Sequence, residues 1–276
     1  MAGPGYDSDF LDTTLAPPEP GQELGGGAGE GAGEGALLDY QHFTLQMHPT
    51  RRLAWWVAWN IDGLRLFPSD SISRSGEDFR ADPRIPATAQ TLDDAYAGNR
   101  LDRGHVARRS DLLWGTLDEA RAANSDSFFF TNITPQMDDF NQSGRGGAWG
   151  LLENAVLAQE GLEDRRLTLF GGPVLREDDP AYRDIVQVPR EHWKVVVYRM
   201  DGQLRYRSFV LSQDLDLGGW DVRRFLDDFD TYLVPLDFLE ERTGLAFASL
   251  RASVPATELR QPDGPVLVLE AEQVAW

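Results

Sequence analysis

The sequence predicts an α+β fold. Apolar runs of strand length outnumber helical patterns, and the strands come in clusters instead of alternating with helices. A length of 276 residues with 41% hydrophobic content is ample for a sizeable core. With no internal repeat and no second linker, we expect one domain over residues 37–276, preceded by an N-terminal segment of residues 1–36.

The N-terminal segment contains two different parts. It carries seven acidic residues and no basic one. Its second part, Gly21–Ala36, is glycine-rich without apolar periodicity, which predicts a flexible linker or surface loop. The part before it contains Tyr6, Phe10 and Leu11. From composition alone, this first part either straps onto the body of the fold or is a disordered tail.

Four apolar runs predict strands. The first, Leu53–Ile61, is followed by Asp62 and Gly63, a turn signal that predicts a hairpin. The other three runs cover residues 127–133, 165–175 and 192–200. Apolar residues at helical spacing predict a helix over residues 151–162. Residues 221–245 predict two further short helices, broken at Pro235.

The charge is acidic overall and basic in one place. The formal net charge is −19, which argues mildly against nucleic-acid binding because phosphate is attracted to a basic face. Between Gly98 and Arg109, however, four arginines accompany one aspartate around His105. Such a local cluster governs a site, whereas the global charge governs long-range approach.

Composition also excludes several classes of protein. The chain has no cysteine, so disulfides, a cysteine nucleophile and thiolate metal sites are excluded. The first residues show no secretory pattern, and no apolar run approaches the ~18 residues of a membrane span. We therefore expect a soluble protein without a membrane partner, cytoplasmic by default, with export by a non-classical route left open. Lys194 is the only lysine, and its presence predicts no function.

Taken singly, the residues near His105 have ordinary structural interpretations. A histidine at a strand end is more often structural than catalytic, and Arg108 with Arg109 fits a solvated turn. Asn132 and Asn141 fit a turn residue and a helix cap. A serine hydrolase with His105 as base is an alternative, but no serine lies in a GxSxG setting. Phosphate-loop, HExxH and EF-hand patterns are absent as well.

The combination of motifs is more specific than its members. The chain contains, in order, DRGH (102–105), TNITPQ (131–136), FNQ (140–142) and W..LE (149–153). Together they resemble the DNA/RNA non-specific endonucleases of the ββα-metal (His-Me finger) superfamily, especially bacterial members. The similarity runs from about Gly5 to Tyr198 and favours the strap over the tail. It implies a ββα-metal fold, with a central, mostly antiparallel sheet flanked by helices.

The resemblance also implies an activity. It is that of a metal-dependent, sequence-non-specific endonuclease that hydrolyses phosphodiester bonds of DNA and RNA. His105 would be the general base that activates water, because an imidazole titrates near working pH. Asn141 matches the one direct protein ligand of Mg²⁺, which keeps several waters; Mn²⁺ or another divalent cation is the alternative. Glu153 matches an acid that holds the water shell of the metal.

The resemblance further implies which residues take part in catalysis, which bind the phosphate of the substrate and which support the site. The implied catalytic residues are His105, Arg103, Asn132 and Glu153. The implied phosphate-binding residues on this stretch are Arg103, Arg108 and Arg109, since guanidinium groups suit phosphate oxygens. Asp102 is expected to brace its strand or Arg103. Gln136, like Asn132, would support the site from the second strand.

Two departures from the family pattern affect the site. Residues 143–147, SGRGG, lengthen the connection so that Glu153 follows Asn141 by twelve residues. One uninterrupted helix would not present both on its original face, so we expect a loop to absorb the insertion. At the position of a second phosphate-binding arginine the chain has Glu77, and Arg74 or Arg80 are the candidates to replace it.

Two alternatives to an active nuclease remain at the level of sequence. One is a nucleic-acid-binding pseudo-nuclease without turnover, which the presence of both His105 and Asn141 disfavours. The other is a partner-binding protein whose functional element is the acidic residues 1–36. The sequence leaves open whether the chain forms a homodimer and whether an inhibitor or regulatory partner binds it.

Overall fold

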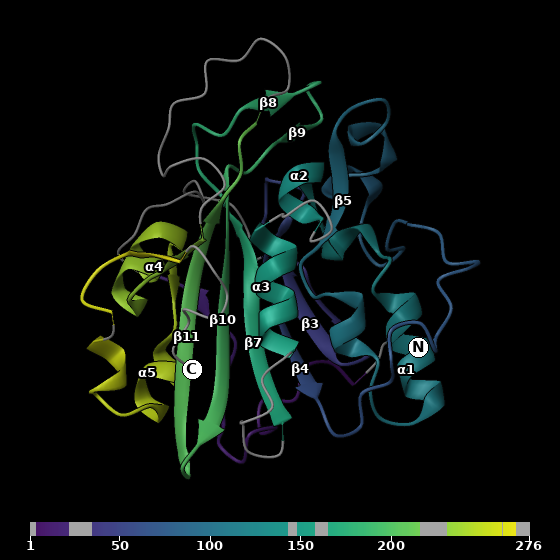
Figure 1. The fold of residues 1–276 in the computed structure, drawn as a ribbon. Helices are drawn as coiled ribbons and strands as arrows, with labels where there is room; N and C mark the ends of the chain where they lie inside the picture. Colours follow the sequence, from purple (N-terminus) through teal and green to yellow (C-terminus); the bar gives the residue numbers. More distant parts are fainter. Residues whose placement is uncertain are drawn as a thin grey trace.

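The computed structural model describes residues 4–21, 35–142, 148–157, 165–215, 231–260 and 262–268. Within these ranges, eight strands form one antiparallel sheet in the order β14-β12-β11-β10-β7-β4-β3-β2 (Figure 1). Their bounds are β2 Leu37–Tyr40, β3 Phe43–Met47, β4 Ala54–Asp62, β7 Arg166–Val174, β10 Glu191–Met200, β11 Gln203–Ser212, β12 Thr231–Leu233 and β14 Val266–Val268. The predicted α+β class and the central antiparallel sheet are confirmed.

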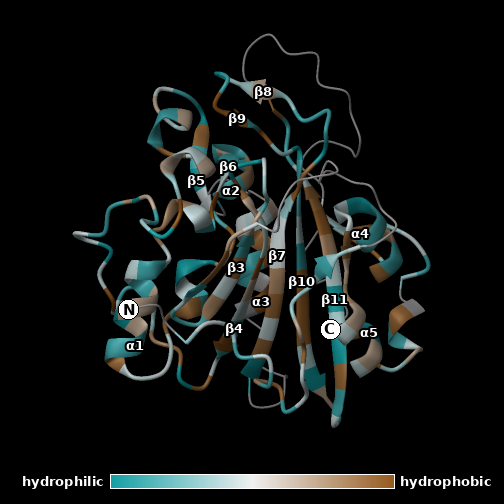
Figure 2. Cartoon of the chain, turned by 180° about the vertical axis from the view of Figure 1, so that it is seen from behind, coloured by the Kyte–Doolittle hydropathy of each residue, from teal (hydrophilic) through white to brown (hydrophobic). Residues whose placement is uncertain are grey.

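The long central strands are apolar on both faces because both faces of the sheet are covered. Along β4, Val57 and Trp59 enter one core cluster, whereas Ala58 enters the other. In β10, Val196 and Val195 divide between the clusters in the same way. Side chains alternate across a strand, so a strand buried on both faces appears in sequence as a continuous apolar run. Figure 2 shows hydrophobic residues along these strands.

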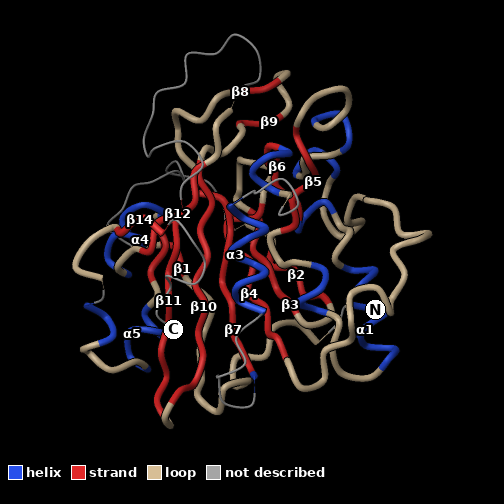
Figure 3. The backbone as a smooth tube through the Cα atoms, viewed as in Figure 1, coloured by secondary structure: helices blue, strands red, loops and turns tan. Residues whose placement is uncertain are grey.

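Helices lie on both sides of the sheet. On one face lies α3 (Ala148–Leu157), whose Trp149 and Leu152 belong to the first core cluster. On the other face lie α4 (Leu236–Thr243) and α5 (Ala248–Ser253), which contribute to the second cluster. Figures 1 and 3 show this layered arrangement.

A separate two-stranded ribbon carries the DRGH motif. It consists of β5 (Leu101–His105) and β6 (Ile133–Met137), paired antiparallel so that His105 lies opposite Ile133. Helix α2 (Asp138–Asn141) follows β6 directly, and α3 begins at Ala148. The order strand, strand, helix is that of a ββα unit. The residues between the two helices lie outside the described ranges.

The connection from β5 to β6 contains the 3-10 turn η3 (Arg109–Leu112) and helix α1 (Leu117–Asp126). Helix α1 begins with a capping box in which Thr116 and Glu119 satisfy each other's backbone amides. The smaller elements are β1 Glu19–Pro20, β8 Ala181–Tyr182, β9 Val186–Gln187, β13 Leu245–Ala246, η1 Ala87–Ala89, η2 Asp93–Ala95, η4 Phe130–Asn132 and η7 Glu258–Arg260.

The described part of the N-terminal segment straps onto the core. The backbone amide of Tyr6 donates to Thr44 Oγ1 at 2.8 Å, and the Phe10 and Leu11 side chains are buried in the second core cluster. Further on, β1 pairs with β13 near the other end of the chain. The strap interpretation is confirmed. The predicted linker lies largely outside the described residues, and the domain division at residue 36 stays a prediction.

Three local predictions need correction. No hairpin follows Asp62: the partners of β4 are β3 and β7, and the turn at this point leads away from the sheet. The strand predicted over 127–133 is wrong, because Ser127 ends α1 and Phe130–Asn132 form the turn η4 before β6 begins. Of the region 221–245, residues 221–230 lie outside the described part, and residues 231–233 form β12 instead of a helix.

The remaining element predictions are confirmed where the structure describes them. Strand β4 matches the first predicted run, β7 the run over 165–175, and β10 the run over 192–200. Helix α3 covers the predicted helix as far as Leu157. Helix α4 begins after Pro235, where the predicted break lies. In the described ranges, no helix combines the length and the apolar character needed to cross a bilayer.

Candidate active site

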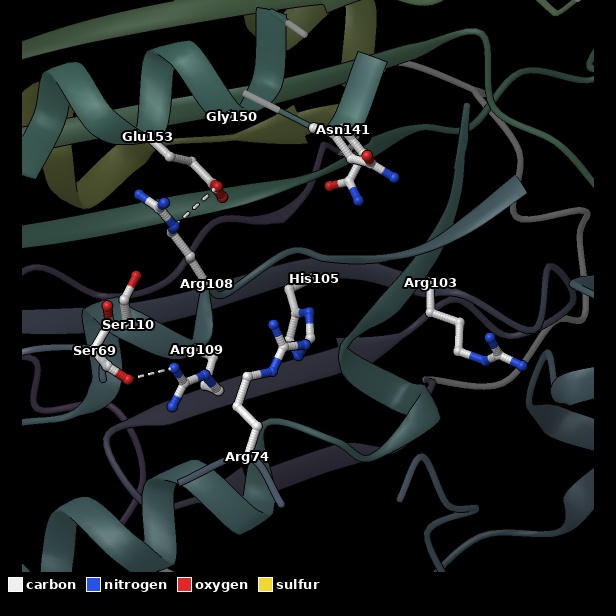
Figure 4. A pocket seen from close by; sticks show the side chains of 11 residues that line it. Ser69, Arg74, Arg103, His105, Arg108, Arg109, Ser110, Asn141, Gly150 and Glu153 are labelled. Atoms are coloured by element: carbon white, nitrogen blue, oxygen red, sulfur yellow. Dashed lines mark hydrogen bonds and ion pairs between the residues drawn. The ribbon is translucent and has the colours of Figure 1, made fainter. Parts of the chain in front are cut away.

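One cavity of about 430 Å³ collects most of the predicted site residues (Figure 4). Of the eleven side chains that the sequence predicts for the site, seven line the cavity: Arg74, Arg103, His105, Arg108, Arg109, Asn141 and Glu153. The other four are Asp102, Asn132, Gln136 and Arg80, which lie outside its lining. Cavity residues that sequence reasoning missed include Ser69 and Ser110, whose types and neighbours carry no distinctive pattern.

His105 lies at the last position of β5, with its ring between those of Phe79 and Phe128. Its Nε2 is buried and has no hydrogen-bond partner among the described residues, so Nδ1 is the ring nitrogen that can reach the cavity. The pKa of this imidazole is lowered to about 3, first by burial and then by the positive charges of three arginines. The ring is therefore neutral at physiological pH and able to accept a proton.

All four histidines have lowered pKa values, with burial as the first cause in each. Below about pH 6.5 the unfolded chain binds protons that the folded chain does not, so stability falls as the pH falls. We expect urea unfolding to show a lower free energy of unfolding at pH 5.5 than at pH 7.5. The pKa of Asp111, raised by burial to about 6, opposes this trend.

A variant tests that prediction. His48 lies outside the cavity, and the pKa of its imidazole is lowered to about 4. The change His48→Gln should reduce the slope of unfolding free energy against pH by up to one proton, about 1.4 kcal/mol per pH unit. An unchanged slope between pH 7.5 and 5.5 would contradict the assignment of buried neutral histidines.

Asn132 fixes the backbone after His105. Its Oδ1 accepts from the amide of Ala107 at 3.0 Å, and its Nδ2 donates to the carbonyl oxygens of Ala107 (3.0 Å) and Ser127 (3.2 Å). The residue is fully buried, and its amide is committed to these bonds. The structure thus places Asn132 in the turn η4 just before the second strand, where it supports the loop after His105 and does not line the cavity.

Asp102 braces Asn141 and not Arg103. Its Oδ2 accepts from Asn141 Nδ2 at 3.1 Å and from Gln142 Nε2 at 2.7 Å. A carboxylate can only accept, so the amide of Asn141 must turn its nitrogen toward Asp102. Among the described residues, none donates a hydrogen bond to the carbonyl oxygen Oδ1 of Asn141. The DRGH aspartate therefore orients the side-chain amide of Asn141 on the helix that follows the ribbon.

Gln136 lies against the glycine of the DRGH motif. Its side-chain amide is buried and without a hydrogen-bond partner in the described part of the chain. A Cβ atom at Gly104 would lie 2.1 Å from Gln136 Oε1. A side chain at position 104 would thus displace Gln136, which explains a glycine inside the strand that carries His105.

Two of the cavity arginines are held by acidic partners. Arg103 Nε donates to Asp93 Oδ1 at 2.9 Å, and its guanidinium lies over the rings of Phe79 and Tyr96. Arg108 Nε lies 3.3 Å from Glu153 Oε2. These contacts limit the side-chain motion of both guanidinium groups at the rim of the cavity.

Arg109 fastens the segment that brings Arg74 to the cavity. Its guanidinium donates to the carbonyl oxygens of Ser69 (2.8 Å) and Ile72 (3.3 Å) and to Asn124 Oδ1 (2.9 Å). Arg74 follows two residues after Ile72. In the described ranges its guanidinium has no hydrogen-bond or ion-pair partner and lies 5.7 Å from the centroid of the Phe128 ring. Figure 4 shows its guanidinium beside the ring of His105.

Arg80 is committed elsewhere. Its Nη2 donates to the carbonyl oxygen of Ser125 at 2.8 Å, and its guanidinium stacks over the ring of Phe129 at 4.0 Å. An ion pair with Glu77 at 3.8 Å completes its contacts. Of the two candidates to replace the second phosphate-binding arginine, only Arg74 reaches the cavity.

Glu153 lines the same cavity as Asn141, although the two lie on separate helices. Its Oε2 contacts Arg108, and its Oε1 lies 3.3 Å from the Nζ of the buried Lys194. The residues 143–147 expected to absorb the insertion lie outside the described residues. The two helices α2 and α3 nevertheless present both side chains to one space.

The donors in the cavity fit a hard cation that keeps most of its water. In the described ranges, no group of three or more histidine, aspartate, glutamate or cysteine side chains could hold a metal. The amide oxygen of Asn141 and the carboxylate of Glu153, which line the same cavity, are oxygen donors. Mg²⁺ is bound in this way, by few protein oxygens and several waters.

Comparisons with known proteins agree with the resemblance that the motifs indicate. The sequence model of a family described as DNA/RNA non-specific endonuclease matches residues 28–253. An uncharacterized protein, y4fB, of Sinorhizobium fredii is 34% identical over 262 residues, covering 88% of this chain and 39% of that protein. This chain thus spans about two fifths of the length of that relative.

Two further comparisons cover most of both partners. Mitochondrial endonuclease G of Bos taurus is 28% identical over 249 residues, covering 84% of this chain and 77% of that protein. A crystal structure of the EndoG/EndoGI complex, whose title concerns EndoG inhibition, superposes with a TM-score of 0.62 at 23% identity. It covers 81% of this chain and 90% of the matched chain, which shows a shared fold.

Proposed function

This chain belongs to the DNA/RNA non-specific endonuclease family, and from that premise we propose that it hydrolyses phosphodiester bonds of DNA and RNA without sequence preference. The observation that carries the proposal is the content of one cavity. A neutral imidazole, four arginines, an amide oxygen and a carboxylate share it. Phosphodiester hydrolysis needs a base for water, positive charge on the phosphate and stabilisation of the leaving oxygen, and this set can supply all three.

His105 would act as the general base. Its Nδ1 accepts a proton from the attacking water, while the buried Nε2 carries the ring proton. In Figure 4 the guanidinium of Arg74 lies beside the ring of His105, and Arg103 lies farther along the same cavity. Both would contact non-bridging phosphate oxygens. The negative phosphate would also offset the arginine charges that lower the pKa of His105, and so raise its basicity when substrate binds.

Asn141 and Glu153 would hold the divalent cation. Asn141 would supply the direct oxygen ligand, oriented by Asp102, and Glu153 would accept hydrogen bonds from water around the cation. When bound, Mg²⁺ supplies Lewis-acid stabilisation of the charge on the departing 3′-oxygen. Mn²⁺ or another divalent cation fits the same oxygen donors.

Lack of sequence preference follows from the kind of contact. Guanidinium groups that grip phosphate position a substrate without reading its bases. Although the whole chain is acidic, the arginines of the cavity provide positive charge at the site itself, where the phosphate would bind. Both DNA and RNA present the same phosphodiester to these groups.

Digestion of supercoiled plasmid and of a long single-stranded RNA, with Mg²⁺ or with EDTA, tests the proposal. We expect nicked and linear plasmid and shortened RNA with Mg²⁺, and neither with EDTA. An inert protein across Mg²⁺, Mn²⁺ and Ca²⁺ that still binds DNA would favour the pseudo-nuclease alternative. Cleavage of one nucleic acid only would correct the substrate class.

Arg74 and Arg80 offer a matched test of the phosphate contacts. Arg74→Ala should weaken binding of a short DNA duplex and reduce the salt dependence of its Kd by about one phosphate contact. Arg80→Ala removes the same charge from a position outside the cavity and should leave that salt slope unchanged. Fluorescence anisotropy in EDTA measures both. An equal reduction in the two variants would contradict the placement of Arg74.

The alternative of a functional acidic tail needs a modified test. Deleting residues 1–36 would also remove Phe10 and Leu11 from the core. A shorter deletion of residues 22–34 retains the strap. Cleavage and partner binding unchanged by this deletion would remove the basis of the alternative. A homodimer, an inhibitor and the cellular compartment stay predictions from sequence.

A further inference from the structure

A pair of buried charges lies beneath the cavity. Lys194 of β10 is fully buried, and Glu153 of α3 has a side chain only 8% exposed. The Lys194 Nζ lies 3.3 Å from Glu153 Oε1. A buried ammonium is costly unless a paired group compensates its charge. Glu153 is the hydrogen-bonded partner of Lys194, and the buried carboxyl group of Asp111 also interacts with the ammonium, whose charge opposes the rise that burial causes in the pKa of that carboxyl.

The surroundings of Lys194 fix the position of its ammonium group. Lys194 lies on the side of the sheet that faces α3. Val196, two residues further along the same strand, points to the same side, because side chains alternate across a strand. The Nζ lies 4.1 Å from the ring centroid of Trp149 and 5.4 Å from that of Trp59. Contacts of a cation with aromatic faces add attraction in a desolvated place.

The two carboxylate oxygens of Glu153 have different partners. Oε1 contacts Lys194 below, and Oε2 contacts Arg108 at the cavity, each at 3.3 Å. Trp149 precedes Glu153 by one helical turn, so both lie on the same face of α3. The ammonium group therefore fastens this face of the helix from beneath and determines which oxygen of Glu153 faces the cavity.

We infer that Lys194 is a positioning residue for the proposed reaction, which holds Glu153 so that Oε2 points toward the water shell of the bound cation. Lys194 itself is too deeply buried to touch substrate. The inference rests on the proposed function of Glu153. It gives a role to the only lysine in a chain whose other 25 Lys/Arg positions are arginine.

A purely structural role for Lys194 is the competing interpretation, and it makes different predictions. A structural lysine would affect stability and leave the affinity for the cation unchanged. A positioning lysine would change that affinity through Glu153. Val196, buried on the same face of β10, provides a packing control because its apolar side chain can form neither a hydrogen bond nor an ion pair with Glu153.

The experiment compares Lys194→Met, Glu153→Gln, the double variant and Val196→Ala. Mn²⁺ binding to the substrate-free protein is measured by isothermal titration, and the Mg²⁺ concentration for half-maximal cleavage is measured in parallel. We expect Lys194→Met to weaken both by roughly 10- to 100-fold, the range for outer-sphere partners of metal sites. Lys194→Arg, which retains the charge, should recover part of the loss.

In the Glu153→Gln background, Lys194→Met should change cation affinity little further, because coupled positions are not additive. Val196→Ala should lower stability in urea and leave cation affinity unchanged. Wild-type affinity in folded Lys194→Met, or equal losses with and without Glu153, would overturn the inference. If Lys194→Met does not fold, Lys194→Gln replaces it in every comparison. A wild-type protein that neither binds Mn²⁺ nor cleaves would instead overturn the proposed function.

Discussion

Replacing His105 with alanine should lower kcat/KM for plasmid cleavage by about 10²- to 10⁴-fold, the usual contribution of general acid–base catalysis. His105 is the one histidine among the residues that line the cavity, and its lowered pKa keeps the ring neutral and able to accept a proton. Its Nδ1 is the ring nitrogen that can reach the cavity. The remaining residues would still bind phosphate, so the Kd for DNA in EDTA should change far less than the rate.

The lowered pKa of His105 adds a second signature. Because the free protein binds no proton on this ring until the pH approaches about 3, kcat/KM should show no acidic limb near pH 6.5. His48→Gln serves as the control, since it removes an imidazole outside the cavity and should alter stability alone. Cleavage by His105→Ala within tenfold of wild type would refute the assignment of the base.

Replacing Asn141 with alanine should have the second largest effect. It removes the proposed direct oxygen ligand, and we expect at least a ~100-fold rise in the Mg²⁺ concentration needed for half-maximal cleavage, the upper range for outer-sphere partners alone. The reason is geometric: Asp102 holds the amide nitrogen, so the oxygen is oriented before the cation arrives.

Gln142→Ala is the matched control for Asn141→Ala. Gln142 also donates to Asp102, at 2.7 Å, and also lines the cavity. Its loss should have a much smaller effect on the Mg²⁺ dependence, because Asn141 retains its own bond to Asp102. Equal effects of the two changes would indicate that the amides act on Asp102 rather than on the cation. Mg²⁺ titrations at saturating plasmid distinguish these outcomes.

Much of the fold could be predicted from the sequence because central strands leave a strong local signal. The runs at β4, β7 and β10 are apolar throughout, since both faces of the sheet are covered. The aromatic run at 127–133 has the composition of such a strand, but Ser127 caps α1 and Phe130–Asn132 form the turn η4. Its side chains are buried one by one after the end of α1, in a turn whose shape depends on Asn132 and distant carbonyl groups.

The candidate site could be predicted only where ordered motifs were available. His105, Asn141 and Glu153 follow from such motifs, and all three line one cavity. The choice between Arg74 and Arg80 could not be made, because it depends on how Arg109 fastens a loop and how Phe129 stacks against Arg80. A role for Lys194 could not be predicted, because its contact with Glu153 joins a strand to a helix 41 positions away in the sequence.

The pairing of β1 with β13 joins Glu19 to Ala246 across almost the whole chain. Contacts between residues far apart in sequence slow folding and form late. On the ribosome, Glu19 and Pro20 would wait for the synthesis of Leu245 and Ala246 before this pair could close. The nucleic acids of the cell, including the messenger being translated, would therefore meet an incompletely assembled protein during synthesis. The topology itself delays closure of this pair until β13 has been synthesised.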